Sequence, residues 1–170
     1  MLFRSHLLFR ALQPLHRLPS GSGKLLEAAA YLHDVGHYIS GVSHHKHSYY
    51  VVSNSDMAGF TDRERFLIAA LCRYHRKALP SPLHGVFQAL SAEERQMLLM
   101  LIPILRLADN LDRSRDQRIE SIDCMLHNGD VVLKVRAKGD IDLEQWGAER
   151  AGEAFQQIYE RKIELVKAKD

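Results

Sequence analysis

The sequence is short of cysteine, of long apolar runs and of net charge, and each shortage argues against a class of protein. Its two cysteines, Cys72 and Cys124, lie far apart and lack the spacing of a zinc motif, which favours a reducing cytoplasm over a disulfide-stabilised secreted protein. No run of about 18 apolar residues is present, so we expect no membrane span and no membrane partner. The opening residues MLFRSH carry no long apolar core or cleavage signature, so we expect no signal peptide. The formal net charge is only +2, so any attraction for phosphate must come from local clusters.

Helical patterning runs through the first two thirds of the chain and predicts a mainly α structure, a helical bundle. Thr61–Glu64 and Ser91–Glu94 each have the form of a capping box, the signal that opens a helix. Ser20–Gly23 is expected to be a flexible link between the first and second helices. The segments expected to be helical are 2–18, about 24 to about 36, 47–54, 65–74 and about 95 to about 111.

The pattern changes after residue 118, where alternating apolar residues predict a β-hairpin around the Asn128–Gly129 pair. The helix that follows is expected to turn Trp146 inward. In order, the expected elements are strands over 119–126 and 131–137, a helix over 142–159 and a third strand over 163–166. With 170 residues to divide, we expect a helical domain over 1–118 and a small α+β appendage packed on it over 119–170.

A His-Asp pair stands at the end of an apolar, alanine-rich stretch, where ionisable side chains cost free energy unless they are paired or bind a metal. His33 and Asp34 form this pair, and His47, His75 and Asp109 are further candidates on separate helices. Helical bundles build metal sites from inward side chains on facing helices. Mixed imidazole and carboxylate ligands suit Mn²⁺, Fe²⁺, Mg²⁺ or Zn²⁺, so the sequence predicts a divalent metal site without selecting the ion.

Simpler explanations exist for the individual candidates. His44 and His45 are expected to be solvated loop residues. Asp109, near the end of its helix, would pair with Arg106 or Arg113 on the same helix end. The candidate histidine at position 75 would cap a helix, since cations complement the dipole there. These explanations account least well for His33 and Asp34.

Basic residues lie beside the candidate ligands in sequence, and arginine forks match phosphate oxygens. The alternative is an ordinary solvated surface. The residues predicted to bind phosphate are Lys46, Arg73, Arg76, Lys77, Arg113, Arg115 and Arg118.

The candidate ligands together resemble the HD superfamily of metal-dependent phosphohydrolases. The longer motifs are similar to the carboxy-terminal HD-like domain of the exopolyphosphatase / guanosine pentaphosphate phosphatase (Ppx/GppA) family. The similarity runs from about residue 8 to the end of the chain. Its motifs are EAAAYLHDVGHYIS at 27–40, HHKHS at 44–48, RYHRK at 73–77 and LRLADNLDRSR at 105–115.

The resemblance implies an HD-like module of an exopolyphosphatase system that binds polyphosphate or a phosphorylated nucleotide. In that family the catalytic machinery lies in amino-terminal actin-like domains, so a separately encoded catalytic subunit is an expected partner, and a homodimer is another. The family pattern puts one more histidine before residue 1, and His6 is out of register. The expected metal site is therefore one ligand short, and the metal weakly bound or absent.

Two alternatives remain open. The first is an autonomous phosphohydrolase that cleaves phosphoanhydrides or phosphoesters. There a metal on His33, Asp34, His75 and Asp109 would activate water while a nearby basic residue, Lys46 or Arg76, steadies the phosphoryl charge. The second is a structural or dimerisation module whose site has decayed.

Overall fold

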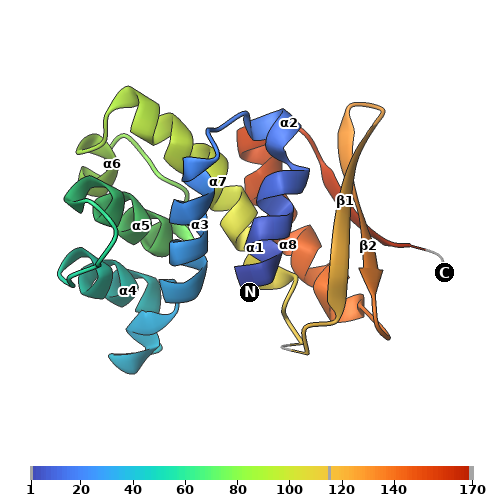
Figure 1. The fold of residues 1–170 in the computed structure, drawn as a ribbon, viewed down its shortest axis with the longest axis horizontal. Helices are drawn as coiled ribbons and strands as arrows, with labels where there is room; N and C mark the ends of the chain where they lie inside the picture. Colours follow the sequence, from blue (N-terminus) through green and yellow to red (C-terminus); the bar gives the residue numbers. More distant parts are fainter. Residues whose placement is uncertain (1, 115, 169–170) are drawn as a thin grey trace.

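The computed structural model, which describes residues 2–114 and 116–168, separates a bundle of helices from a small sheet (Figure 1). The helices α3 to α7 lie on one side of the molecule, and α1 and α8 lie between them and the strands. The helical elements of the bundle are α1 (Leu2–Ala11), α2 (Gln13–His16), α3 (Gly21–Leu32), the 3₁₀ helix η1 (Val35–Tyr38), α4 (His44–Ser53), α5 (Asp62–Tyr74), α6 (Gly85–Gln88) and α7 (Ala92–Asn110).

Both predicted capping boxes form. At the start of α5, Thr61 accepts a hydrogen bond from the backbone N–H of Glu64, whose carboxylate accepts one from the Thr61 N–H. Ser91 and Glu94 make the same reciprocal pair at the start of α7. These contacts satisfy N–H groups that a helix start leaves without partners. They therefore fix the residues at which α5 and α7 begin. The distance from each start to the far end of its helix is fixed with it.

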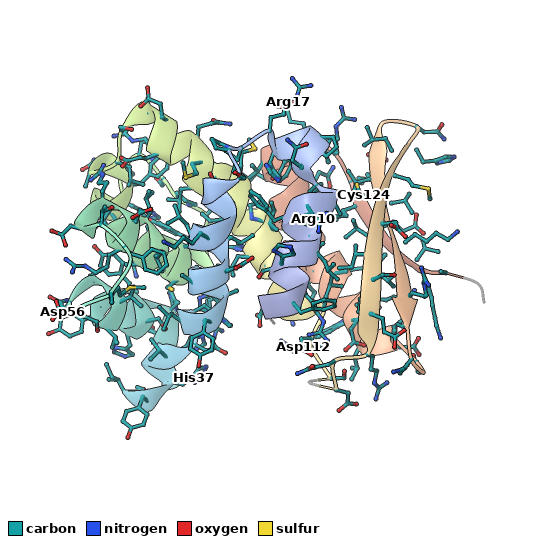
Figure 2. The ribbon with its side chains drawn as sticks, in the orientation of Figure 1. Arg10, Arg17, His37, Asp56, Asp112 and Cys124 are labelled. Atoms are coloured by element: carbon teal, nitrogen blue, oxygen red, sulfur yellow. The ribbon has the colours of Figure 1, made fainter. Side chains whose placement is uncertain are left out.

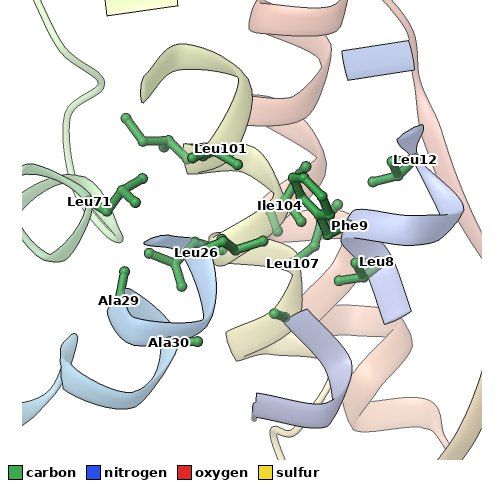
Figure 3. Packing of buried hydrophobic residues seen from close by; sticks show 14 of the residues in the cluster. Leu8, Phe9, Leu12, Leu26, Ala29, Ala30, Leu71, Leu101, Ile104 and Leu107 are labelled. Carbon is green, nitrogen blue, oxygen red and sulfur yellow. The ribbon is translucent and has the colours of Figure 1, made fainter. Parts of the chain in front are cut away.

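The core joins α1, α3 and α7 (Figure 3). Leu8, Leu26 and Ile104 are each fully buried, and burial of such a side chain contributes roughly 1.5–3 kcal/mol.

The prediction of a flexible link over Ser20–Gly23 is wrong, because α3 already begins at Gly21. A Cβ on Gly23 would lie 3.2 Å from two ring carbons of Phe9, so the glycine lets α3 pack closely on α1.

The carboxy-terminal part is a three-stranded sheet with one helix, in the predicted order. The strands lie in the order β1-β2-β3, with an antiparallel β1–β2 pair and a parallel β2–β3 pair. Asn128 and Gly129 both have positive φ, as the predicted hairpin turn requires. The elements are β1 (Ile119–His127), β2 (Asp130–Ala137), α8 (Asp142–Tyr159) and β3 (Ile163–Lys167).

The mainly α fold with a small α+β appendage is confirmed. The division between residues 118 and 119 stays a prediction; α8 contacts α7, and β1 contacts α1, so the two parts share packing. Trp146 differs from expectation, because it is 46% exposed rather than inward. None of the helices in the described part of the chain combines the length and apolarity that a membrane crossing requires.

Candidate metal and phosphate site

His33 and Asp34 stand where α3 ends. The backbone N–H of His33 still bonds Ala29 O at 2.8 Å, and its ring Nδ1 lies 2.9 Å from Ala30 O. The other ring nitrogen, Nε2, therefore points away from the helix, 3.4 Å from an Asp34 carboxylate oxygen. Asp34 is the residue that leads into η1. The end of α3 thus presents one buried imidazole and one half-exposed carboxylate side by side.

Close packing of η1 on α4 brings the next histidine to the pair. A Cβ on Gly36 would lie 2.2 Å from His44 O and 2.4 Å from Ser48 N, so only glycine permits this approach. The Ser48 hydroxyl links the two segments, because it donates to His33 O at 2.5 Å and accepts from the Gly36 N–H at 2.9 Å. The start of α4 is therefore held directly against the end of α3.

This packing buries His44 and His45, and the expectation that they are solvated loop residues is wrong. His44 Nε2 lies 3.2 Å from an Asp34 oxygen and 3.2 Å from His75 Nε2. His47 occupies a different position, with its Cβ against the backbone of Gly36. Among the described residues His47 belongs to neither group of converging ligand atoms, and His44 stands where we had expected it.

Two further ligand candidates come from the ends of α5 and α7. His75 follows α5, with Nδ1 2.7 Å from Cys72 O and Nε2 3.7 Å from Asp34. Asp109 lies in the last turn of α7, with a carboxylate oxygen 3.5 Å from His33 Nε2. The Arg106 side chain, an expected partner of Asp109, instead donates to the carbonyl of Tyr74, the last residue of α5, and to those of Lys77 and Ala78 just after it.

The convergent side chains are called here the imidazole–carboxylate cluster: His33, Asp34, His44, His75 and Asp109. Ligand atoms of His33, Asp34 and His75 lie within 4.8 Å of one another, and those of Asp34, His37 and His44 form a second such group. Asp34 belongs to both groups. His37 is at the surface, with its ring stacked on that of His44 at 3.7 Å.

The cluster fits a divalent metal. The rings of His33 and His75 turn Nδ1 to a backbone carbonyl, which fixes the tautomer that leaves Nε2 for a metal. Among the described residues the buried Nε2 of His33 makes no hydrogen bond, and carboxylate oxygens of Asp34 and Asp109 lie 3.4 Å and 3.5 Å from it. The mixed nitrogen and oxygen donors suit the transition metals and zinc better than magnesium.

Protonation states in the cluster follow from burial and the two carboxylates. Burial lowers the pKa of His75 to about 4 and also lowers the pKa of His44, so both rings are neutral near pH 7. Burial opposes a proton on His33, but Asp109 and Asp34 outweigh it and raise that pKa to about 9. Contact with His33 in turn holds the pKa of Asp34 well below its usual range. Metal binding through His33 would therefore release a proton.

The cluster opens into a cavity of about 540 Å³ whose wall carries five cationic side chains and three carboxylates. Arg76, Lys77 and Arg113 were predicted from the sequence, whereas Arg106 and Arg150 were not. His37 and Asp112, two lining residues, are at the same end of the molecule (Figure 2). Figure 1 shows that α8, which carries Arg150, passes the end of α7.

The other predicted phosphate-binding residues do not line this cavity in the described part of the chain. Arg118 forms an ion pair with Asp116 and also donates to Asp140 O. Lys46 is exposed on α4, and Arg73 is half-buried on α5. Arg115 falls outside the described residues.

Comparison with known proteins decides the family. Residues 5–146 match the family described as Ppx/GppA phosphatase, domain III. The chain belongs to the Ppx/GppA phosphatase family. A guanosine-5'-triphosphate,3'-diphosphate pyrophosphatase from Pseudoalteromonas translucida is 33% identical over 121 residues, which is 69% of this chain. The enzyme of the same name from Pseudoalteromonas atlantica is 33% identical over 138 residues, or 75% of the chain. These alignments span only 21% and 27% of the two relatives.

Proposed function

We propose that this Ppx/GppA-family chain is an HD-type module that binds a divalent metal and, through it, polyphosphate or a phosphorylated guanosine nucleotide. The observation that carries the proposal is the opening of the imidazole–carboxylate cluster into the same cavity as five cationic side chains. Neither feature alone indicates phosphate, because clustered histidines occur without ligands and arginines are common on surfaces. The names of the relatives, guanosine-5'-triphosphate,3'-diphosphate pyrophosphatases, favour a phosphorylated nucleotide.

In this proposal His33, Asp34, His75 and Asp109 hold the metal, and His44 replaces His47 as the fifth candidate ligand. A bound divalent ion supplies positive charge that attracts phosphoryl oxygens and polarises the phosphorus–oxygen bonds. The guanidinium of Arg76, 3.2 Å from His44 Nδ1, is placed to contact a phosphoryl group above the cluster. Lys77 and Arg113 add charge on the cavity wall.

The catalytic unit, the cellular compartment and the assembly in which this chain acts are also part of the proposal. The relatives are several times longer than their aligned parts, so we assign the actin-like catalytic unit of such a system to residues beyond these 170, in the same polypeptide or in a partner. Cys72 and Cys124 are both free thiols, which supports the cytoplasm as the compartment. A homodimer is the other proposed assembly.

Hydrolysis by the cluster itself is a second candidate function, and the position of His37 favours it. Its Nε2 lies 3.7 Å from Asp34, and about half of the side chain is exposed. A histidine there can accept a proton from an attacking water through Asp34 and pass it to solvent. Arg76 would steady the charge that develops on the phosphoryl oxygens.

Calorimetric titration of metal-stripped protein tests the proposal. We expect binding of Mn²⁺, and we expect polyphosphate and guanosine pentaphosphate to bind the Mn²⁺-loaded protein more tightly at low salt than at high salt. Asp34→Asn should weaken Mn²⁺ binding by more than about 100-fold, because Asp34 belongs to both ligand groups. Asp56→Asn, a matched change at an exposed carboxylate away from the cavity, should have no effect.

The outcomes separate the candidate functions. If the protein binds none of Mn²⁺, Mg²⁺, Fe²⁺ and Zn²⁺ and neither phosphorylated ligand, the module is structural and the site has decayed. If Mn²⁺ and ligand bind and inorganic phosphate is released on incubation, hydrolysis replaces binding as the function. Release that disappears in Asp34→Asn but persists in Asp56→Asn would assign the reaction to this site.

A further inference from the structure

Trp146 on α8 is exposed beside the cavity and is flanked by two arginines. The guanidinium carbon of Arg150 lies 4.8 Å from the centre of the indole ring, and that of Arg113 lies 5.7 Å from it. Both distances are within the range of cation–π attraction. One indole ring thus contacts two cationic side chains at once. Arg113, Trp146 and Arg150 are called here the tryptophan–arginine group.

Neither arginine of this group has a carboxylate partner among the described residues. The ion pairs of the described arginines involve Arg4, Arg63, Arg65 and Arg118. Stacking on an aromatic ring uses the face of a guanidinium and leaves the N–H donors at its edge available. In the part of the chain that the structure describes, the donors of Arg113 and Arg150 therefore form no ion pair with an acid.

Close packing of α8 on α7 places this group at the cavity. A Cβ on Gly147 would lie 2.8 Å from Asn110 O and 3.0 Å from Asn110 Cβ, so the glycine lets α8 approach the end of α7. Asn110 directly follows Asp109 of the imidazole–carboxylate cluster. Arg150, about one turn after Gly147, lines the same cavity as Asp34, His75 and Asp109.

Several elements contribute to the wall of the cavity. Asp34 and Asp109 meet the histidines of the imidazole–carboxylate cluster, and Arg113 and Arg150 line the same cavity from the segment after α7 and from α8. Its volume of about 540 Å³ exceeds what a single phosphate fills and lies within the range of small-molecule sites. A phosphoryl group at the cluster would leave Arg113 and Arg150 available to the rest of a longer anion.

We infer that Arg150 and Arg113, held on Trp146, bind the distal phosphoryl groups of a ligand that carries at least two, and so select polyphosphorylated anions over monophosphates. The inference rests on the proposed function, since it needs one phosphoryl group at the cluster. An inorganic polyphosphate chain and the phosphate chain of a nucleotide offer the same chemistry to the two guanidinium groups. This assigns to α8, outside the helical bundle, a direct part in ligand binding.

The experiment compares affinities of Mn²⁺-loaded protein for orthophosphate, inorganic tripolyphosphate and GTP. Wild type should bind tripolyphosphate and GTP more tightly than orthophosphate. Arg150→Ala should weaken tripolyphosphate binding by about tenfold or more, since it removes a charge-assisted contact. Orthophosphate binding and Mn²⁺ binding should change by less than about twofold. Arg136→Ala, which removes an equal charge at an exposed position on β2 away from the cavity, is the matched control and should leave all affinities in place.

Trp146 is the only tryptophan of the chain, so its fluorescence gives a second, direct readout. Its emission should change when tripolyphosphate binds and should not change with orthophosphate. Trp146→Phe keeps a ring beneath the arginines and should retain most of the affinity, whereas Trp146→Ala should lose about as much as Arg150→Ala. Thermal unfolding of each variant checks that the fold persists.

The outcomes are distinct. If tripolyphosphate binds wild type tightly and Arg150→Ala behaves like Arg136→Ala, the inference is wrong and the proposed function stands. If no phosphate species binds any Mn²⁺-loaded variant, the proposed function has failed first. If Arg150→Ala kept its affinity for tripolyphosphate but lost its affinity for GTP, the arginine would recognise the nucleoside. That result would overturn the inference that Arg150 binds phosphoryl groups common to both ligands.

Discussion

The imidazole–carboxylate cluster and the tryptophan–arginine group line one cavity but are held in place differently. The histidines of the cluster are buried, and His33 and His75 are fixed by carbonyls of their own helices. The arginines of the other group are exposed and are oriented by contacts with one ring. Backbone packing therefore sets the geometry of the cluster, while side-chain contacts set that of the arginines. Changes that disturb backbone packing should therefore damage the cluster, whereas the two arginines should respond to changes in the side chains that hold them.

Gly36→Ala should have the largest effect, because a Cβ there meets the backbone of α4 rather than a movable side chain. We expect a loss of about 3 kcal/mol in the free energy of unfolding, the upper end for overpacking, together with loss of Mn²⁺ binding. Urea unfolding and metal titration measure the two effects. Gly21→Ala is the matched control, since no atom of the described residues lies within 4 Å of its added Cβ. If Gly36→Ala kept both stability and metal binding, the close packing of η1 on α4 would not position the cluster.

His44→Ala and His47→Ala compare two histidines one helical turn apart on α4. His44 contacts Asp34 and His75, so its loss should weaken Mn²⁺ binding by about 100-fold. His47 lies outside both ligand groups of the described residues, and its removal should change Mn²⁺ affinity by less than about threefold. Calorimetry on the two purified variants decides. If His47→Ala instead weakened Mn²⁺ binding more than His44→Ala, His47 would again be the ligand, as the sequence motif suggests.

Ser48→Ala should have a smaller effect on stability. Its hydroxyl accepts from the buried Gly36 N–H, which would lose its partner at a cost of about 1–2 kcal/mol. Ser53→Ala on the same helix removes a hydroxyl that has no hydrogen-bond partner among the described residues, so it should change stability by less than about 0.5 kcal/mol. Equal losses in the two variants, measured by urea unfolding, would show that the Ser48 link between α3 and α4 contributes little.

Much of the fold could be predicted from local signals. The capping boxes mark the starts of α5 and α7, and Asn128–Gly129 marks the hairpin, because each depends on residues close in sequence. The local signal at Gly21–Gly23 was misleading, because it predicted a flexible link where α3 begins. A Ser-Gly run is locally flexible, and only its contact with Phe9, distant in sequence, shows that it belongs to a helix.

The site was harder to predict than the fold. An acid and a histidine in an apolar context pointed to His33, Asp34 and Asp109, and the structure brings all three together. His44 was passed over because its burial depends on Gly36, eight residues earlier. Arg150 carries no local signal at all, since it joins the cavity only through the approach of α8 to Asn110. Its position could not have been deduced from spacing.

Anomalous diffraction from crystals of the wild-type protein grown with Mn²⁺ would place the ion directly. We expect one strong peak between Nε2 of His33 and His75 and the carboxylate oxygens of Asp34 and Asp109, with His44 next to it. Such a peak would establish that the cluster is a metal centre. A peak bound by other residues, or no peak in crystals that contain the ordered cluster, would contradict it.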